Sequence, residues 1–344
     1  MIRTAARRTI ALGALAALAV LLAPGSALAQ GPTGRIVGVT AENGQLQVVF
    51  ETRGLPEGVS VDPDSVQVKL DTTELDPDAE PIGQTKPVDR SVMLALDASE
   101  SMADDIDEAK AAAETFLDTV PADVKVGLVT FAKKATLAVK PTTQRDEVRD
   151  QVRQIDTSVG TALYDGIQLA VDNLGEDGVR SIVLLSDGDD TTSTADLPST
   201  VEDLGASGVD LDAVAFDQGD TQVLGELTAA GTGRLVQTAD RTDLESLFEE
   251  SAEAIAGQVL ITAPLPATIQ AGDFNVAVEA TAGAAVLADS VVGFVTEAGL
   301  PPVPKAGPAP VNPTAGFFDS DPALLAGGML LFAGLAVIAG FGFA

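Results

Sequence analysis

Hydrophobic and polar positions follow two different periods along this chain. Near the start and again near the end, apolar and polar side chains alternate in short segments, which is typical of half-buried strands. These segments are residues 35–40, 45–51, 65–70, 259–262, 274–280 and 286–295. Asn43-Gly44, between the first two, predicts a hairpin turn. We therefore expect a β-rich flank over residues 30–88 and another over 258–299.

Between these flanks, short apolar runs alternate with segments in which apolar residues recur every three or four positions. The apolar runs are 92–96, 124–131, 182–185, 209–216 and a short one near Leu235. The helical periods cover 106–120, 148–155, 163–174 and 244–255. Buried strands between amphipathic helices predict an α/β domain over residues 89–257, with a doubly wound, mostly parallel sheet of the Rossmann-like kind. Ligands of such sheets bind at the carboxyl ends of the strands.

The two β-rich flanks are each too short for a comfortable sandwich. Together they supply about six or seven strands, which is the size of an immunoglobulin-like β-sandwich. We therefore expect the α/β domain to be inserted into one composite sandwich in which residues 258–299 pair with residues 30–88.

Both ends of the chain resemble membrane-targeting segments. Residues 1–29 hold three arginines, an apolar run and Ala27-Leu28-Ala29, a pattern that predicts a signal peptide cleaved after Ala29. Residues 323–344 are apolar and uncharged, which predicts a C-terminal transmembrane helix. A Pro-rich linker over 300–322 precedes it. We expect a single-pass protein of the cell membrane with its body on the extracytoplasmic side. Since no basic cluster follows this helix, we expect either a truncated gene product or a longer protein cut short at this point.

Composition excludes several classes of function. The chain has 344 residues, with 20 basic against 51 acidic side chains and a net charge of −31, which argues against a nucleic-acid partner. No phosphate-binding P-loop is present, so we expect no nucleotide. Cys and His are absent, which excludes thiolate or imidazole metal sites and Ser–His–Asp or Cys–His catalysis.

Three predicted loops carry side-chain oxygens at the same edge of the predicted sheet. Asp97, Ser99 and Ser101 follow the first buried strand, Thr161 precedes a helix, and Asp187 follows the strand that ends near Leu185. Two carboxylates and three hydroxyls are hard donors, so they predict a site for Mg²⁺, with Mn²⁺ or Ca²⁺ as alternatives. The competing interpretation is that each residue only caps a helix or forms a turn.

These residues resemble the metal-ion-dependent adhesion site of von Willebrand factor type A domains. The family pattern is Asp-x-Ser-x-Ser, then a Thr, then an Asp, and all five positions are filled in this order. The resemblance implies that Ser99, Ser101 and Thr161 bind the metal directly, whereas Asp97 and Asp187 act mainly through waters. It also implies that a Glu or Asp carboxylate of a partner protein completes the coordination.

Three functions are compatible with these features. The first is a non-catalytic module that is exported, anchored to the membrane and mediates metal-dependent binding or adhesion to another protein. The second is the extracytoplasmic scaffold of a type II secretion or pilus-assembly protein, by analogy with domains of the same family. The third, which we favour least, is a Mg²⁺-dependent phosphohydrolase with Asp97 as nucleophile, because Ser99 is a poor acid–base group for it. We therefore expect no enzyme activity.

Overall fold

The computed structural model describes residues 31–83, 88–187, 189–216, 221–296 and 299–301. The predicted signal peptide over 1–29 and the predicted transmembrane helix over 323–344 lie outside these residues, as does nearly all of the predicted linker over 300–322.

The predicted location in the cell membrane needs a correction. Among the described residues, no helix combines the length and the apolar character that a membrane span requires. This finding contradicts the predicted location as a single-pass membrane protein. The segment on which that prediction was based, residues 323–344, is not among the residues described.

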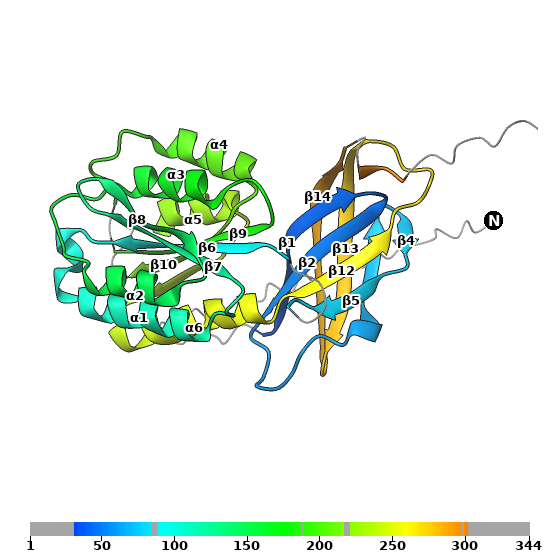
Figure 1. Cartoon of the computed structure of the whole chain (residues 1–344), viewed down its shortest axis with the longest axis horizontal. Coiled ribbons are helices and arrows are strands. Elements are labelled where there is room, and N and C mark those ends of the chain that lie inside the picture. The colour runs from blue at the N-terminus through cyan, green and yellow to red at the C-terminus, as the bar shows by residue number, and fades with distance from the viewer. Residues whose placement is uncertain (1–30, 84–87, 188, 217–220, 297–298, 302–344) are drawn as a thin grey trace, which may run out of the picture. The chain divides into compact units, whose positions relative to one another are not determined.

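A six-stranded sheet forms the centre of the α/β region (Figure 1), and its strand order is β11-β10-β9-β6-β7-β8. The strands are β6 (Arg90–Asp97), β7 (Lys125–Phe131), β8 (Ala135–Thr142), β9 (Val179–Ser186), β10 (Asp210–Phe216) and β11 (Leu235–Thr238). All neighbours are parallel except β7 and β8. Because β7 lies on one side of β6 and β9 on the other, the loops after β6 and β9 meet at the topological switch point, where such sheets bind ligands. The parallel α/β architecture agrees with the prediction.

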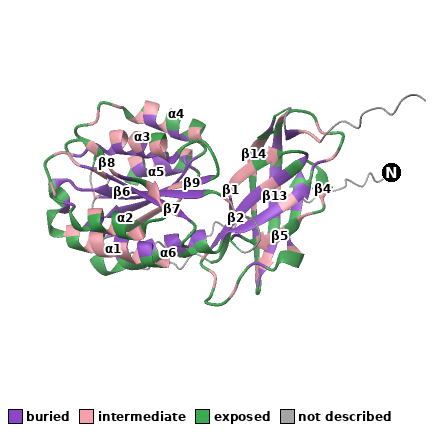
Figure 2. Cartoon of the chain, viewed as in Figure 1, coloured by how far each residue is buried: buried purple, intermediate pink, exposed green. Residues whose placement is uncertain are grey.

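Helices cover both faces of this sheet (Figure 1). The helices are α1 (Ile106–Thr119), α2 (Arg145–Arg153), α3 (Leu163–Leu174), α4 (Leu197–Ser207), α5 (Thr221–Ala230) and α6 (Arg241–Ala256). Strand β6 shows why two layers form: Leu94 and Leu96 pack with α1, α2 and α6, whereas Met93 and Ala95 pack with α3, α4 and α5. A strand buried on both faces reads as a continuous apolar run, and Figure 2 shows the central strands as buried.

The flanking segments form two four-stranded sheets, in the orders β1-β2-β12-β5 and β14-β13-β3-β4. The strands are β1 (Thr33–Glu42), β2 (Gln45–Arg53), β3 (Gln67–Leu70), β4 (Thr73–Leu75), β5 (Asp78–Pro81), β12 (Val259–Pro264), β13 (Gly272–Ala282) and β14 (Ala285–Val295). Antiparallel pairing of β12 with β2 and of β13 with β3 joins segments from the two ends of the chain. The sheets share one core that contains Phe50, Val276 and Leu287. The immunoglobulin-like name and the domain boundaries remain predictions.

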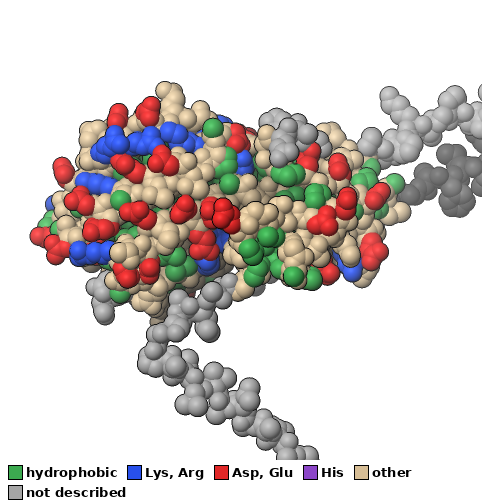
Figure 3. Space-filling view, turned by 90° about the horizontal axis from the view of Figure 1, so that it is seen from below, with side chains coloured by type: hydrophobic (Ala, Val, Ile, Leu, Met, Phe, Trp, Pro, Cys, Tyr) green, Lys and Arg blue, Asp and Glu red, His purple; other side chains and the backbone are tan. Residues whose placement is uncertain are grey.

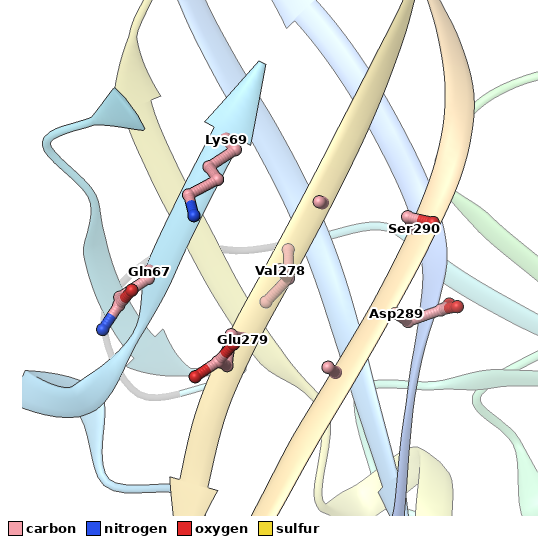
Figure 4. A pocket seen from close by; sticks show the side chains of 8 residues that line it. Gln67, Lys69, Val278, Glu279, Asp289 and Ser290 are labelled. Carbon is pink, nitrogen blue, oxygen red and sulfur yellow. The ribbon is translucent and has the colours of Figure 1, made fainter. Parts of the chain in front are cut away.

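The outer face of the second sheet is shallowly hollowed (Figure 4). A hollow of about 450 Å³ lies over β3, β13 and β14, and Lys69, Glu279 and Ser290 are among its lining residues. Along β14, the same face exposes Val286, Val292 and Phe294. These residues belong to an outward-facing side of a sheet and lie outside the predicted metal site.

Several elements were not predicted from the sequence, namely β4, β5, β8, α4 and α5. Helices α4 and α5 bury only a few side chains, such as Leu204 in α4 and Leu227 in α5, so their apolar period is weak. Strand β8 pairs antiparallel at the edge of the sheet, and only one of its residues, Val139, is fully buried. Short or one-sided elements leave little periodic signal.

Candidate metal centre

Asp97 is the last residue of β6, and its side chain is completely buried. Its Oδ1 accepts a hydrogen bond from the Ser99 backbone N–H at 2.8 Å, and its Oδ2 accepts one from the Ser186 hydroxyl at 2.7 Å. Ser186 ends the neighbouring strand β9. Asp97 therefore fixes the turn after β6 and ties it to the end of β9. The capping interpretation is partly right, since Asp97 does organise its own turn.

Beyond Asp97, three predicted ligands lie in one chain of oxygens. The hydroxyl oxygens of Ser99 and Ser101 are 2.9 Å apart, and the Ser101 hydroxyl donates to Asp187 Oδ1, also at 2.9 Å. Ser99 is almost fully buried, whereas Ser101 is exposed. The chain of oxygens thus runs from the interior to the surface, so that a group bound at Ser101 is open to solvent on one side.

Thr161 lies in an adjoining loop that is tied to the same edge. Ser158 N–H donates to the Ala98 carbonyl at 2.9 Å, and Ala162 N–H donates to the Ala132 carbonyl at 2.7 Å. Thr161 is 5% exposed, and among the described contacts its hydroxyl makes no hydrogen bond. The structure thus joins Asp97, Ser99, Ser101 and Asp187 directly, and holds Thr161 next to them through the backbone of its loop.

The loop after β9 depends on two carboxylates that the sequence analysis did not single out. The carboxylate of Asp190 accepts hydrogen bonds from the Tyr164 N–H at 3.2 Å and from the hydroxyl and N–H of Ser193. Asp165, in the first turn of α3, accepts the N–H groups of Thr194 and Ala195. Together they hold the Asp187 loop against the start of α3. No local motif in the sequence predicts these contacts.

The electrostatics of Asp97 favour a nearby positive charge. Burial raises the pKa of Asp97 to about 6, and the negative charge of Asp187 adds to the shift, whereas the hydrogen bonds from Ser99 and Ser186 oppose it. Asp97 is buried, and the two groups that donate hydrogen bonds to it, the Ser99 N–H and the Ser186 hydroxyl, carry no charge. Such an arrangement is expensive unless a cation neutralises it.

The donor set fits a hard divalent cation. Within the described residues, no group of three or more His, Cys, Asp and Glu side chains is placed to hold a metal, so a cation at this edge must use hydroxyl oxygens. Neighbouring oxygens around octahedral Mg²⁺ lie about 2.9 Å apart. Around tetrahedral Zn²⁺ they lie about 3.3 Å apart. The spacings of 2.9 Å along Ser99, Ser101 and Asp187 are those of ordinary hydrogen bonds, and they also lie close to the octahedral value.

A second cluster of buried carboxylates lies at the opposite end of the parallel strands. Glu51, Asp210 and Asp212 are each less than 10% exposed. Arg35 contacts Glu51 at 3.0 Å and Asp210 at 2.7 Å, and Arg53 contacts Glu51 at 2.8 Å and also pairs with Asp212. We refer to these five residues as the arginine cluster. Its carboxylates already have cationic partners, so it is not a metal-site candidate.

The pKa values of the two aspartates in this cluster shift in opposite directions. Burial raises the pKa of Asp210 to about 8, with Asp212 adding to the shift and Arg35 opposing it. Burial also acts on Asp212, but Arg53 and Arg35 outweigh it and hold the pKa of that carboxyl below its usual range. The pair therefore titrates as a coupled unit, in which one carboxylate stays charged more readily than the other.

Comparison with known proteins identifies the domain that carries the candidate site. The family model of the von Willebrand factor type A domain matches residues 92–189. A UPF0353 protein from Mycolicibacterium paratuberculosis is 38% identical over 92 residues, which cover 25% of this chain and 28% of that protein. A second UPF0353 protein, from Mycolicibacterium gilvum, is 31% identical over 116 residues, or 29% of this chain and 35% of that protein. The chain thus spans about a third of the length of these curated relatives.

Two solved structures align with part of this chain at low sequence identity. The von Willebrand factor type A protein from Catenulispora acidiphila has 13% sequence identity and a TM-score of 0.47, covering 78% of this chain and 74% of that one. Proximal thread matrix protein 1 from the mussel byssus, described with a zinc-occupied MIDAS motif, has 17% identity and a TM-score of 0.45 over 54% of this chain and 49% of its own. The family match alone assigns residues 92–189 of this chain to the von Willebrand factor type A domain.

Proposed function

We propose that this domain binds a divalent cation at the oxygen cluster of Asp97, Ser99, Ser101, Thr161 and Asp187, and uses it to bind a carboxylate of a partner protein. The observation that carries the proposal is the continuous chain of oxygens from Ser99 through Ser101 to Asp187, with spacings of 2.9 Å and an exposed end. The hydroxyl ligands add no negative charge, so a cation held by them and by Asp187 can still bind an outside carboxylate.

Each residue has a distinct part in this proposal. Ser99, Ser101 and Asp187 would hold the cation, and the hydroxyl of Thr161 is available from the adjoining loop. Asp97 would supply buried negative charge and orient the turn through Ser99 and Ser186. When bound, the cation supplies a positive charge at the surface that attracts a carboxylate.

Mg²⁺ suits these hard oxygen donors, and Mn²⁺ shares its preference for oxygen donors in octahedral geometry. Larger Ca²⁺ bonds at about 2.3–2.6 Å would require the three oxygens to move apart. A site held by Asp190 and Asp165 against α3 has little freedom for such movement.

The proposal is one of binding, without a catalytic step. A carboxylate nucleophile needs an exposed oxygen that can reach its substrate. Asp97 is 0% exposed, and both of its oxygens accept hydrogen bonds. We therefore do not propose a phosphohydrolase in which Asp97 attacks a phosphoester.

The cation half of the proposal is tested by thermal unfolding of the full chain in Mg²⁺ and in chelator. At a Mg²⁺ concentration a hundredfold above the dissociation constant, binding should stabilise the folded state by about 2.7 kcal/mol. Ser99→Ala with Ser101→Ala should remove this response. Glu100→Gln is the matched control, because Glu100 is an exposed acid between the two serines and should leave the response unchanged. A wild-type protein that does not respond to Mg²⁺ or Mn²⁺ would contradict the proposal.

The carboxylate half is tested with synthetic peptides that carry one Asp in a Gly/Ser background. On a peptide array, the full chain should bind these peptides in Mg²⁺ and not in chelator, and should not bind the same peptides with Asn in place of Asp. Equal binding of the Asp and Asn peptides would show that the cation does not receive a carboxylate.

A further inference from the structure

The loop between β7 and β8 borders the candidate metal centre. It comprises Ala132, Lys133 and Lys134, and its Ala132 carbonyl accepts the Ala162 N–H at 2.7 Å. Gly160 has a φ of +84°, and a Cβ at this position would lie 3.4 Å from Lys133 Cα and 2.8 Å from Thr192 Cγ2. The backbone of Lys133 is therefore packed against the loop that carries Thr161.

The two lysines of this loop differ from nearly all other basic residues of the described chain. Each described arginine makes an ion pair or a hydrogen bond, and Lys69, Lys110 and Lys125 each make an ion pair. Within the described residues, only the ammonium groups of Lys133, Lys134 and Lys140 have no such partner, and all three side chains are exposed.

Such free positive charge is unusual on this surface. The net charge of the chain is −31, and acidic side chains are spread widely over the face shown in Figure 3. Lys133 and Lys134 occupy the turn at the carboxyl end of β7, whereas Lys140 lies towards the other end of β8. Two of the three free lysines are thus at the edge of the sheet that carries the metal centre.

On the adjoining loop, an apolar side chain is exposed. Val159 is 55% exposed, and it lies between Ser158, which is bridged to Ser99, and Gly160. The other large hydrophobic residues exposed in the described chain are Val286, Val292 and Phe294, all on β14. Val159 is therefore the single exposed large hydrophobic residue of the described α/β region, and it lies two positions before Thr161.

Two exposed acidic residues also lie next to the predicted metal ligands, on the loops after β6 and β9, and we refer to the exposed residues around the candidate metal centre as its rim. Glu100 lies between Ser99 and Ser101, Asp189 lies two positions after Asp187, and both are exposed. The surface around the centre is therefore asymmetric, with Lys133 and Lys134 on one loop and Glu100 and Asp189 on the others. Glu100 and Asp189 would repel a partner with uniform negative charge. A partner whose acidic residue faces Lys133 and Lys134 would match this surface.

We propose that this rim selects a protein segment of defined chemistry: the carboxylate that reaches the metal, a second acidic residue that faces Lys133 and Lys134, and an aliphatic residue that contacts Val159. This inference rests on the proposed function, because the first carboxylate needs the bound cation. Charge complementarity fixes the orientation of the segment, and the exposed valine adds apolar contact area.

A peptide array in Mg²⁺ tests the inference with the full chain. Each peptide has a fixed Asp in a Gly/Ser background, with one Glu and one Leu moved through the three positions on either side. The wild type should prefer peptides with the added Glu by about twofold to fivefold over the same peptides with Ser, and less so in 0.5 M salt. An added Leu should raise binding by about threefold at its best position.

Variants assign each preference to its residue. Lys133→Ser with Lys134→Ser should lose the preference for Glu, and Val159→Ser should lose the preference for Leu. Lys140→Ser is the matched control, because it removes an equally free lysine from the other end of the same hairpin and should change neither preference. All variants should keep the thermal response to Mg²⁺.

The outcomes separate this inference from the proposed function. If the wild type binds the single-Asp peptides in Mg²⁺ but shows no preference for Glu, or if the lysine variants behave like Lys140→Ser, the rim inference is wrong and the metal-dependent function stands. If no peptide binds and no Mg²⁺ response is seen, both are wrong. If Mg²⁺ stabilises the protein but no peptide binds, the metal site stands and the inferred partner chemistry is overturned.

Discussion

Buried carboxylates occur at both ends of the parallel strands, but the two groups have different hydrogen-bond partners. At the amino ends, Asp210 and Asp212 pair with Arg35 and Arg53. At the carboxyl ends, Asp97 and Asp187 accept hydrogen bonds from Ser186, Ser101 and the Ser99 N–H. Hydroxyls are donors without charge, so they satisfy the hydrogen-bonding capacity of the carboxylates and leave their negative charge.

This difference separates a structural cluster from a binding site. In the arginine cluster the cations are part of the chain and come from strands β1 and β2, which are far from β10 in sequence. In the candidate metal centre the hydroxyls bring no positive charge, and the exposed Ser101 leaves one end of the oxygen chain open to solvent.

Removing an arginine from the arginine cluster should have the largest effect. Arg53→Met leaves Glu51 and Asp212 buried with half of their positive charge removed, so we expect a loss of about 3–5 kcal/mol in the free energy of unfolding, measured with urea. Arg149→Met is the control, because Arg149 pairs with the exposed Asp118, and it should cost less than about 1 kcal/mol. Equal losses would show that the arginine cluster contributes no more than a surface pair.

At the candidate metal centre, removing a charge should abolish the response to Mg²⁺ and change the stability in chelator only a little. Asp97→Asn should abolish the Mg²⁺ stabilisation of about 2.7 kcal/mol expected at a hundredfold excess over the dissociation constant. In chelator the same variant should stay within about 1 kcal/mol of the wild type, since the amide removes a buried charge. Urea unfolding with and without Mg²⁺ measures both numbers. A variant that is strongly destabilised in chelator would show that Asp97 is mainly structural.

The pH dependence of stability should distinguish the two groups further. Burial raises the pKa of Asp210 to about 8, so the folded state holds this proton more tightly than the unfolded state. Its protonation stabilises the fold at low pH, and this contribution is lost as the pH rises from about 4 through 8. Relative to Asp210→Asn, the wild type should therefore lose stability on the order of 2 kcal/mol between pH 5 and 8.

Stability curves at several pH values, with Asp273→Asn as an exposed control, would measure this difference. A wild type that keeps a constant stability relative to Asp210→Asn over this range would show that Asp210 stays charged beside Arg35. Mg²⁺ should not alter this pH dependence, because the arginine cluster lies at the other end of the strands.

The smallest expected effect concerns the loop that carries Asp187. Asp190→Ala removes the hydrogen bonds to Tyr164 and Ser193 and should weaken Mg²⁺ binding by about tenfold, as groups that orient metal ligands commonly do. Asp189→Asn, which changes an exposed acid of the same loop, should leave the affinity nearly unchanged. Isothermal titration calorimetry compares the two variants. Similar affinities would mean that the loop is fixed by other contacts.

The position of the candidate metal centre was easier to predict from the sequence than that of the arginine cluster. Asp97, Ser99 and Ser101 follow a strand whose apolar run is continuous, and the parallel topology places the loop after β9 beside them. Strand order therefore predicts that these oxygens meet. The side-chain contacts of Asp190 were not predictable, because they depend on how the loop folds back on α3.

The arginine cluster has no local signature. Arg35 and Asp210 are 175 residues apart, and each alone reads as an ordinary charged residue in a strand. The pairing arises only when β1 and β10 have been placed by their separate sheets. Elements with weak apolar periods, such as α4 and α5, escaped prediction for a related reason: their positions depend on the sheet that they cover.

Crystals grown with Mn²⁺ and measured at the manganese absorption edge would test the central claim most directly. The account predicts one anomalous peak within bonding distance of the hydroxyl oxygens of Ser99 and Ser101, and none at Glu51, Asp210 and Asp212. A peak at the arginine cluster, or no peak beside Ser99 and Ser101 with Mn²⁺ in excess, would contradict it.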